Sequence, residues 1–335
     1  MDRKVRLINM AEVEQTLSMT EVLKLVEQAF MERGKGRAQM PPKSYIFFSR
    51  HNGDLRVMPA YLEELNEPGV KLVNVHPDNP AKHGIPTVLA TILLFDPDTG
   101  TPVCIMDGTF VTTMRTAAAS GVAVKYLARK DSRVLGVVGA GGQSLRQVEA
   151  INEVLKLEQV KVFDVAESRA NELARTIEQR FGLSAKGVSS AEEVAKGSDV
   201  IVTVTPSSTP VVHDSWVGAG THISAIGADA AGKEELEPAL LKRAKIVVDD
   251  WEQASHSGEI NVPVAKGVLT HADIHADIGE VVAGQKKGRT SETEITVFDS
   301  TGLAIQDVIT AWHAYRVAME KGLGSEIAPL YLRGQ

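Results

Sequence analysis

A glycine-rich turn in the middle of the chain has the residue types that a phosphate-binding site needs. Residues 139–144 read Gly-Ala-Gly-Gly-Gln-Ser, between an apolar run and a segment with helical periodicity. The glycines allow a tight turn and a close approach of the backbone to a pyrophosphate, and the next helix offers free N–H groups. Because Ser144 replaces the third glycine of the usual fingerprint, a plain structural turn is the alternative. The motif predicts dinucleotide contacts at Gly139, Gly141, Gly142, Gln143 and Ser144.

An acidic residue stands where such a site would need one. Asp164 lies at the end of the second strand-like run, 22 residues after Gly142, where a carboxylate accepts hydrogen bonds from the adenine ribose. A carboxylate there would repel the 2′-phosphate of NADP, so we expect NAD as the cofactor, with Val165 also in contact. The alternative role of Asp164 is to cap the helix that follows.

Cationic side chains interrupt apolar stretches at three positions in the first half of the chain. Arg56 and Lys71 lie on strand-like stretches, where exposed strands could also carry them, and Arg115 lies in a helix start that is otherwise small and apolar. Arginine can bind a carboxylate or phosphate with two hydrogen bonds. Asp229 follows a further strand-like run, so it would face the crevice at the carboxyl ends of the strands. The alternative for Asp229 is to cap a helix over Lys233–Leu241.

The elements that must position these residues alternate between strand and helix from residue 134 onward. Helical periodicity marks Gln143–Leu157 and Ala170–Phe181. This alternation predicts an α/β fold, a doubly wound parallel sheet of the Rossmann type. The expected strands are Val134–Val138, Val160–Val165, Val200–Thr205, Ile223–Ile226, Ile246–Val248 and Ile295–Phe298.

The first part of the chain has a different pattern. Ser18 and Glu21 have the spacing of a capping box that opens a helix. Short strand-like runs separated by turn residues then predict an antiparallel sheet, followed by an alanine-rich helix over Val111–Leu127. A last helix, Ile305 to Met319, is expected to pack back on this region. The predicted domains are therefore an α+β domain of residues 1–120 plus 306–335 and a Rossmann domain of residues 121–305.

Composition narrows the class of protein. The chain has 335 residues and a net charge of −7, which disfavours nucleic acid and anionic membranes as partners. No apolar run reaches the length of a membrane span, and Met1–Met10 lacks the apolar core of a signal peptide. Cys104 is the only cysteine, so we interpret it as a buried apolar residue. Together these features predict a cytoplasmic protein.

Two histidines have a spacing that can bind zinc on a helix. His271 and His275 stand four residues apart, but no glutamate base lies between them. We therefore expect a polar loop here and no bound metal.

Six segments together resemble the ornithine cyclodeaminase/mu-crystallin family. They occur in the family's order and span nearly the whole chain. Within the family the chain is most similar to archaeal-type alanine dehydrogenases, in particular over residues 40–43, 53–56, 249–250, 256–261 and 301–307. The segments are Arg56-Val-Met-Pro-Ala, Lys71-Leu-Val-Asn-Val-His-Pro, Met114-Arg-Thr-Ala-Ala-Ala-Ser-Gly, Gly139-Ala-Gly-Gly-Gln, Ile226-Gly-Ala-Asp229 and Phe298-Asp-Ser-Thr-Gly302.

The resemblance implies roles for individual residues. Lys71 corresponds to the family's active-site lysine and Asp229 to the carboxylate partner of the amino group. Arg115 and Lys43 correspond to cations that bind the substrate carboxylate, and we add Arg56 to them. The resemblance also implies a homodimer joined through the sheet of the first domain. The remaining expected cofactor contacts are Thr205, Gly227, Ala228 and Ser300.

Position 56 distinguishes activities within the family. Ornithine cyclodeaminases carry a glutamate there for the distal ammonium of ornithine, and this chain has an arginine. The reversed charge favours a small, uncharged amino acid. We therefore expect NAD-dependent, reversible oxidative deamination of L-alanine or a similar small amino acid to a 2-oxo acid and ammonium. The alternatives are ornithine cyclodeamination, reduction of a cyclic ketimine such as pyrroline-2-carboxylate, and a mu-crystallin-like binding protein with little activity.

Overall fold

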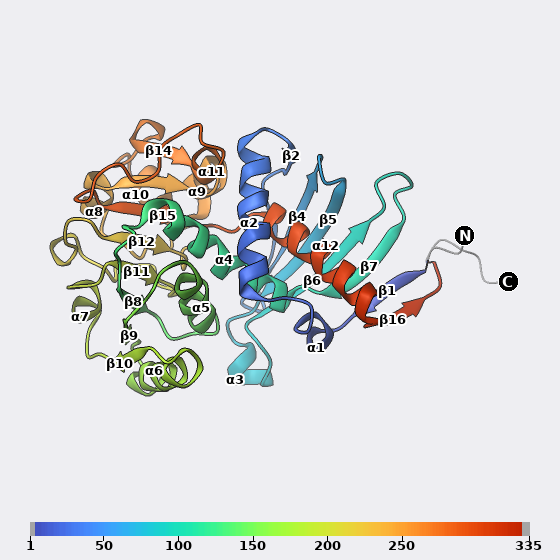
Figure 1. Cartoon of the computed structure of the whole chain (residues 1–335), viewed down its shortest axis with the longest axis horizontal. Coiled ribbons are helices and arrows are strands. Elements are labelled where there is room, and N and C mark those ends of the chain that lie inside the picture. Colours follow the sequence, from blue (N-terminus) through green and yellow to red (C-terminus); the bar gives the residue numbers. More distant parts are fainter. Residues whose placement is uncertain (1–3, 330–335) are drawn as a thin grey trace. The chain divides into compact units, whose positions relative to one another are not determined.

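A computed structural model describes residues 4–329 of the chain (Figure 1). The chain divides into two compact units. Unit 1 consists of Met1–Arg115 with Leu303–Gln335, and unit 2 consists of Thr116–Gly302. The outer ends of the predicted first domain, residues 1–3 and 330–335, lie outside the described residues.

Unit 1 contains a mixed sheet and the helices that cover one of its faces. Helix α4 begins in this unit and continues into unit 2. The elements are β1 (Val5–Ile8), α1 (Met10–Val13), α2 (Met19–Gly34), β2 (Ala38–Gln39), β3 (Ser44–Phe48), β4 (Gly53–Leu62), β5 (Glu67–Val75), α3 (Asn79–His83), β6 (Val88–Phe95), β7 (Pro102–Asp107), α4 (Thr109–Leu127), α12 (Ala304–Lys321) and β16 (Ser325–Ile327).

The sheet of unit 1 confirms the antiparallel pairing predicted for its central strands. Its order is β16-β1-β7-β6-β5-β4-β2, and β3 also pairs with β4. The pairings among β4, β5, β6 and β7 are antiparallel, whereas β1 lies parallel to β7. Alternate residues of β4 and β5 are buried, because α12 packs on β4, β5 and β6 as well as on α2. The last helix therefore packs on the first region, as predicted.

Unit 2 alternates strands with helices. Its elements are β8 (Val134–Val138), α5 (Ser144–Val154), β9 (Gln159–Phe163), α6 (Glu167–Phe181), β10 (Ser184–Gly187), α7 (Ala191–Ala195), β11 (Val200–Thr203), η1 (Asp214–Trp216), β12 (His222–Ala225), α8 (Pro238–Arg243), β13 (Lys245–Val248), α9 (Trp251–Ser257), α10 (Asn261–Ala265), η2 (His271–Asp273), β14 (Ile274–Asp277), α11 (Ile278–Val282) and β15 (Thr296–Asp299).

The sheet of unit 2 is parallel and covered on both faces, which confirms the predicted fold class. Its order is β10-β9-β8-β11-β12-β15-β13-β14. The chain adds β9 and β10 on one side of β8 and then returns to add β11 on the other side, so the strand order reverses at β8. Neighbouring residues of one strand pack on opposite faces. Val200 and Val202 join α5 and α6 in one apolar cluster, whereas Ile201 joins α7, α8 and α9 in another. Burial on both faces explains why these strands are continuous apolar runs.

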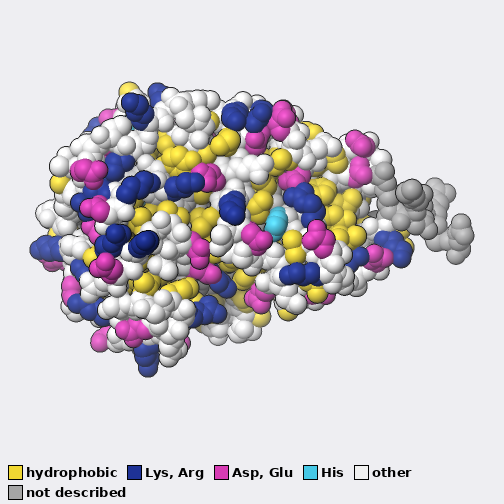
Figure 2. Space-filling model, in the orientation of Figure 1, with side chains coloured by type: hydrophobic (Ala, Val, Ile, Leu, Met, Phe, Trp, Pro, Cys, Tyr) yellow, Lys and Arg dark blue, Asp and Glu magenta, His cyan; other side chains and the backbone are white. Residues whose placement is uncertain are grey.

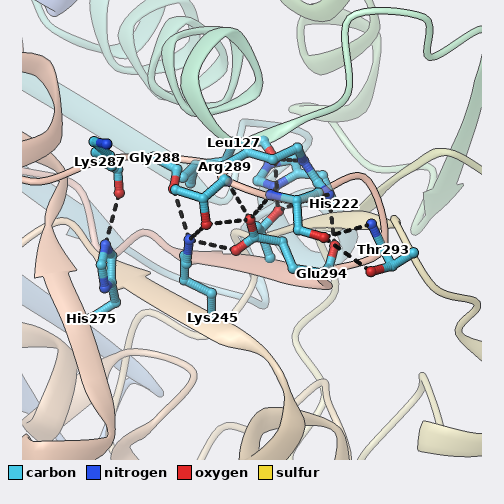
Figure 3. Close-up of polar contacts among 12 residues, drawn as sticks. Leu127, His222, Lys245, His275, Lys287, Gly288, Arg289, Thr293 and Glu294 are labelled. Atoms are coloured by element: carbon cyan, nitrogen blue, oxygen red, sulfur yellow. Dashed lines mark hydrogen bonds and ion pairs between the residues drawn. The ribbon is translucent and has the colours of Figure 1, made fainter.

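A polar cluster lies at the edge of this sheet where the amino ends of its strands meet, the amino edge (Figure 3). Arg289 donates to the carbonyl oxygens of Leu127 and Glu294 and to Thr296 Oγ1. Lys245, the first residue of β13, pairs with Glu294 and donates to the Gly288 carbonyl oxygen. These bonds tie the end of α4 to the starts of β13 and β15, at the edge of the sheet opposite the carboxyl ends of the strands.

Two sequence expectations in unit 2 are wrong. The helix over Lys233–Leu241, considered as one that Asp229 could cap, begins only at Pro238. The chain before it pairs with another segment, since Val212 forms a bridge with Leu236. The polar loop expected around His271 is instead the short helix η2 followed by strand β14. Both patterns were too short to separate local turns from strand pairing.

The surface view agrees with the balanced composition. Figure 2 shows lysine and arginine side chains interspersed with aspartate and glutamate side chains on the face that it draws. Between residues 4 and 329, no helix combines the length and the apolar character that crossing a membrane requires.

Candidate active site

Lys71 is the central residue of a charged cluster inside unit 1. It lies on the buried face of β5, under α12, and its side chain is 1% exposed. Its Nζ atom lies 2.7 Å from Asp307 Oδ2 and 3.3 Å from Thr112 Oγ1. The Thr112 hydroxyl donates its own proton to the Gly108 carbonyl, so its lone pairs are available to Lys71. The lysine therefore has two fixed acceptors.

Asp307 joins the predicted lysine to the predicted arginine. Arg115 Nε donates to Asp307 Oδ1 over 2.8 Å, and Arg115 Nη1 donates to Gln306 Oε1 over 3.1 Å. The Asp307 side chain is fully buried. One carboxylate thus separates two cations and fixes the position of each.

This environment shifts the acid–base behaviour of Lys71. Burial lowers the pKa of the Lys71 ammonium, and the positive charges of Arg115 and Lys43 lower it further, whereas Asp307 opposes them; the resulting pKa is about 7. A lysine with that pKa exchanges protons readily at neutral pH. Burial is the largest cause of this shift, and the two neighbouring cations add to it.

Arg56 is held separately from this cluster. Its Nε and Nη2 atoms donate to the two carboxylate oxygens of Asp54, over 2.9 and 3.1 Å, and its guanidinium lies 5.4 Å from the centre of the Tyr45 ring. Arg56 and Lys71 both lie on the buried face of the sheet, on the neighbouring strands β4 and β5. These two hydrogen bonds to the Asp54 carboxylate hold the Arg56 guanidinium in a fixed orientation.

Asp307 and Thr112 were not predicted as site residues. Asp307 lies in the first turn of α12, among buried apolar residues such as Ile305 and Val308. The available signal was an acidic residue on the apolar face of a helix, because a buried carboxylate needs a cationic partner. The same kind of signal identified Arg115.

In unit 2, the glycine turn has the shape of a phosphate cradle. Gly139 has φ +105°, and a Cβ atom there would lie 2.7 Å from the Val204 carbonyl oxygen, so only glycine fits between β8 and β11. At Gly141 and Gly142 an added Cβ would meet no atom within 4 Å. Ser144, in place of the third glycine, donates its hydroxyl to the Gly139 carbonyl over 2.8 Å. The serine therefore stabilises the turn that the glycines form.

Asp164 braces this turn and does not cap a helix. Its Oδ2 accepts from the Ala140 N–H and its Oδ1 from the Ala166 N–H, each over 2.8 Å. The N-cap of α6 is Ala166, so the alternative reading of Asp164 as a cap is wrong. The side chain of Val165 next to it is 96% exposed, an unusual position for an apolar residue.

The other predicted cofactor residues follow neighbouring strands of the same parallel sheet. Thr205 comes after β11, Gly227 and Ala228 come after β12, and Ser300 comes after β15. Carboxyl ends of parallel strands share one edge, where α/β folds bind their ligands. Ser300 Oγ and Gln143 Oε1 are buried and have no hydrogen-bond partner among residues 4–329. Acceptors and donors of this kind suit a dinucleotide.

Asp229 lies in the same edge region of unit 2. Its carboxylate pairs with Lys233, four residues further along the chain. Asp229 does not cap a helix, because α8 begins at Pro238 with Glu237 before it. Its proposed role in the reaction stays a prediction.

Two other residues have clear structural settings. Cys104 is buried, and burial raises the pKa of its thiol to about 12, which confirms its interpretation as an apolar residue. His271 packs on the Trp251 ring. Across the described part of the chain, no three histidine, cysteine or acidic side chains come together as metal ligands.

The parallel sheet with its glycine turn at the point of strand reversal defines a Rossmann-type dinucleotide-binding protein. The chain belongs to the ornithine cyclodeaminase/mu-crystallin family, whose model matches residues 3–322. The family resemblance of the sequence is thereby confirmed.

Individual relatives are similar over nearly their whole length. The alanine dehydrogenase of Archaeoglobus fulgidus is 52% identical, over 96% of this chain and 97% of its own. The solved structure of an archaeal alanine dehydrogenase dimer with bound NAD has a TM-score of 0.93 at 52% identity, covering 97% of this chain and 99% of that one. The Thermococcus litoralis Δ1-pyrroline-2-carboxylate reductase, in complex with NADH and L-proline, has a TM-score of 0.94 at 42% identity, covering 96% and 100%.

Proposed function

We propose that this protein is an NAD-dependent dehydrogenase of L-alanine or a similar small, uncharged amino acid. The reaction is L-alanine + NAD⁺ + H₂O giving pyruvate, ammonium, NADH and a proton, reversibly. The observation that carries the proposal is the buried Lys71–Asp307–Arg115 cluster, which provides a proton carrier at neutral pH beside a carboxylate-binding cation. The cytoplasmic location expected from the sequence is part of the proposal.

The residues of unit 2 would hold the cofactor. The glycine turn suits the pyrophosphate, Asp164 suits the adenine ribose, and Gln143 and Ser300 offer buried polar atoms. NAD, when bound, would accept a hydride from the α-carbon of the amino acid. The protein supplies the orientation.

Asp164 also predicts cofactor preference. In Asp164→Ser, loss of the carboxylate removes both its ribose hydrogen bonds and its repulsion of a 2′-phosphate. The ratio of kcat/KM for NAD to that for NADP should fall about 10- to 100-fold, the range of a charged hydrogen bond. Steady-state rates with each cofactor measure it, with Glu167→Gln, in the first turn of α6, as the control. An unchanged ratio in Asp164→Ser would contradict this role.

Lys71 would move the proton. In its neutral form, Nζ can accept a proton from the water that attacks the imine carbon of the oxidised substrate, and in the reverse direction it returns the proton. Arg115 would bind the substrate carboxylate, with Arg56 and Lys43 as the other cations. Asp229 would orient the amino group.

A homodimer is part of the proposal. The face of the unit 1 sheet away from α12 is apolar and half-exposed, and neighbouring strands place Val57 beside Leu72, and Val70 beside Leu93, which itself lies beside Ile105. A half-exposed apolar sheet face of this kind is usually covered by another subunit. The archaeal alanine dehydrogenase of similar structure is a dimer.

Reduction of a cyclic imine is the second candidate. The specific support is the reductase that has L-proline and NADH bound and 42% identity to this chain. L-Proline and L-alanine share the α-carboxylate that Arg115 would bind, so the cations do not discriminate between them.

The deciding experiment is NADH formation with purified protein, NAD and a panel of L-amino acids, together with NADH consumption with Δ1-pyrroline-2-carboxylate. Turnover of alanine with little turnover of proline, ornithine or the cyclic imine is the expected result. Turnover of the cyclic imine alone would replace the proposal with the reductase. NADH binding without any turnover would leave a binding protein.

A further inference from the structure

Three buried carboxylates lie near the carboxyl edge of the unit 2 sheet, outside the predicted site. They are Glu235, Glu259 and Asp299, and each is 0% exposed. Each one accepts N–H groups from the backbone. Asp299 accepts from Glu259 and Ile260, and Glu259 accepts from Glu235 and Leu236. The carboxylates therefore form a series in which each member holds the backbone of the next.

Glu235, at the end of this series, joins the ends of two strands. Its Oε1 accepts from the N–H and the hydroxyl of Thr205, over 2.7 and 2.8 Å. Its Oε2 accepts from the Gly227 N–H and the Thr203 hydroxyl, each over 2.8 Å. Each carboxylate oxygen thus binds one backbone N–H and one hydroxyl.

Gly227 is tightly packed between the Thr205 backbone and the Glu235 carboxylate. A Cβ atom at Gly227 would lie 2.1 Å from the Thr205 carbonyl oxygen and 2.6 Å from the Glu235 carboxylate. Glycine is therefore required at 227, and the Glu235 carboxylate packs directly on its backbone. Asn261 holds the same loop further along, since its Oδ1 accepts from the Gly232 N–H and its Nδ2 donates to the Lys233 carbonyl.

Burial explains how three acids can be so close. Burial raises the pKa of Glu235, and burial together with the charges of Glu235 and Asp299 raises the pKa of Glu259 well above its usual value. Both shifts favour the protonated, uncharged carboxyl, which reduces the repulsion among the three acids.

We infer that Glu235 is a positioning residue of the dehydrogenase, which fixes Thr205 and the Gly227–Asp229 segment for cofactor and substrate. This inference rests on the proposed function, because Thr205 and Gly227 are expected cofactor contacts and Asp229 is the expected carboxylate partner of the amino group. A carboxylate that only stabilised the fold would affect unfolding but not turnover by correctly folded molecules.

The hydrogen-bond pattern predicts that a glutamine side chain at position 235 cannot accept from both backbone N–H groups. In Glu235→Gln, either orientation of the amide directs its NH₂ group at a backbone N–H, of Thr205 or of Gly227. Hydroxyls can rotate to accept, but a backbone N–H cannot. We expect kcat per NADH-binding site to fall about 100-fold, as for a reacting group displaced by about 1 Å.

The same substitution at Glu259 should be tolerated. Its Oε1 accepts from both Glu235 N–H and Leu236 N–H, whereas Oε2 shares only the Glu235 N–H, over 3.0 Å. Glu259→Gln can keep its oxygen at the Oε1 position, where both backbone N–H groups still have an acceptor. Its NH₂ group then replaces only the second contact of the Glu235 N–H, whereas in Glu235→Gln one backbone N–H loses the carboxylate oxygen that it binds. We expect turnover within about threefold of the original, the effect of one weak hydrogen bond.

The test compares Glu235→Gln, Glu259→Gln and the control Glu237→Gln, whose partly exposed carboxylate accepts from the Asp214 N–H. NADH fluorescence gives the number of binding sites and the dissociation constant for NADH, and kcat is expressed per binding site. The expected result is a 100-fold loss in Glu235→Gln, with weaker NADH binding, and near-normal values in the other two. Equal values in all three variants would overturn the inference.

Two further arms separate the possible failures. If Glu235→Gln does not fold, Thr205→Val removes one hydroxyl donor to Glu235, and Thr205→Ser retains it; equal per-site turnover and NADH affinity in these two variants would overturn the inference. If the unmodified protein oxidises no amino acid, the proposed function fails first. The NADH dissociation constants of the same variants then still test whether Glu235 positions the cofactor site.

Discussion

Lys71→Met is expected to lower kcat about 1,000-fold, within the range of a lost general acid/base. Methionine has nearly the length of lysine and suits a fully buried position, but it cannot exchange the proton that Lys71 Nζ carries with a pKa of about 7. The variant also leaves Asp307 paired with Arg115, so no buried charge loses its partner. Steady-state oxidation of L-alanine measures the effect.

Binding of NADH should be unchanged in Lys71→Met, because the expected cofactor residues all belong to unit 2. Lys245→Met is the matched control: it removes a largely buried lysine that pairs with Glu294 at the amino edge of the sheet (Figure 3). That variant should lose stability and keep its turnover. Near-normal kcat in Lys71→Met would show that another group moves the proton.

Local patterns were sufficient to predict several elements of both units. Val134–Val138 is a strand with the predicted bounds, because a run buried on both faces is apolar without interruption. Ser18 caps α2 by accepting from the Glu21 N–H, as the capping-box spacing predicted. Such signals depend only on neighbours within a few residues, so one sequence contains them.

Contacts between distant residues could not be predicted in the same way. Asp307 and Arg115 are 192 residues apart, and neither position has a local pattern that names the other. Glu235 lies in the segment 233–241, for which a helix capped by Asp229 was the alternative interpretation. Its actual role depends on N–H groups after β11 and β12, whose positions only the folded sheet defines.

Arg115 and Lys71 show the intermediate case. A cation within an apolar run is costly to bury without a partner, so the sequence could mark both as unusual without naming the carboxylate that joins them. The family resemblance supplied roles for these two residues but none for Asp307. The structure identifies Asp307 as the carboxylate that pairs with both cations.

Asp307→Asn is expected to change the pH dependence of the reaction as well as its rate. The Asp307 carboxylate raises the pKa of Lys71, against burial and the charge of Arg115. Without that carboxylate, the ammonium form of Lys71 is less stable and its pKa falls below the present value of about 7. Oxidative deamination needs the neutral amine, so the acidic limb of kcat/KM against pH should move to lower pH.

The rate and the stability of Asp307→Asn should fall as well. Arg115 loses the acceptor that orients its Nε, so the KM for the amino acid should rise, and kcat/KM should fall about 100-fold for a misplaced carboxylate anchor. Removing the buried carboxylate that Lys71 and Arg115 share should cost about 3–5 kcal/mol of folding free energy. Lys71 binds its proton less tightly in the folded than in the unfolded chain, so stability should rise with pH between its folded pKa and about 10.4.

Glu67→Gln is the control that separates these effects. Glu67 is another buried acid; it lies on β5 and pairs with Arg316 of α12. Loss of its charge should reduce stability without affecting Lys71. Rates from pH 5 to 9, with NADH binding as the measure of folded protein, give both profiles. A limb that moves in Asp307→Asn and not in Glu67→Gln would assign the protonation state of Lys71 to Asp307, whereas identical profiles would exclude that role.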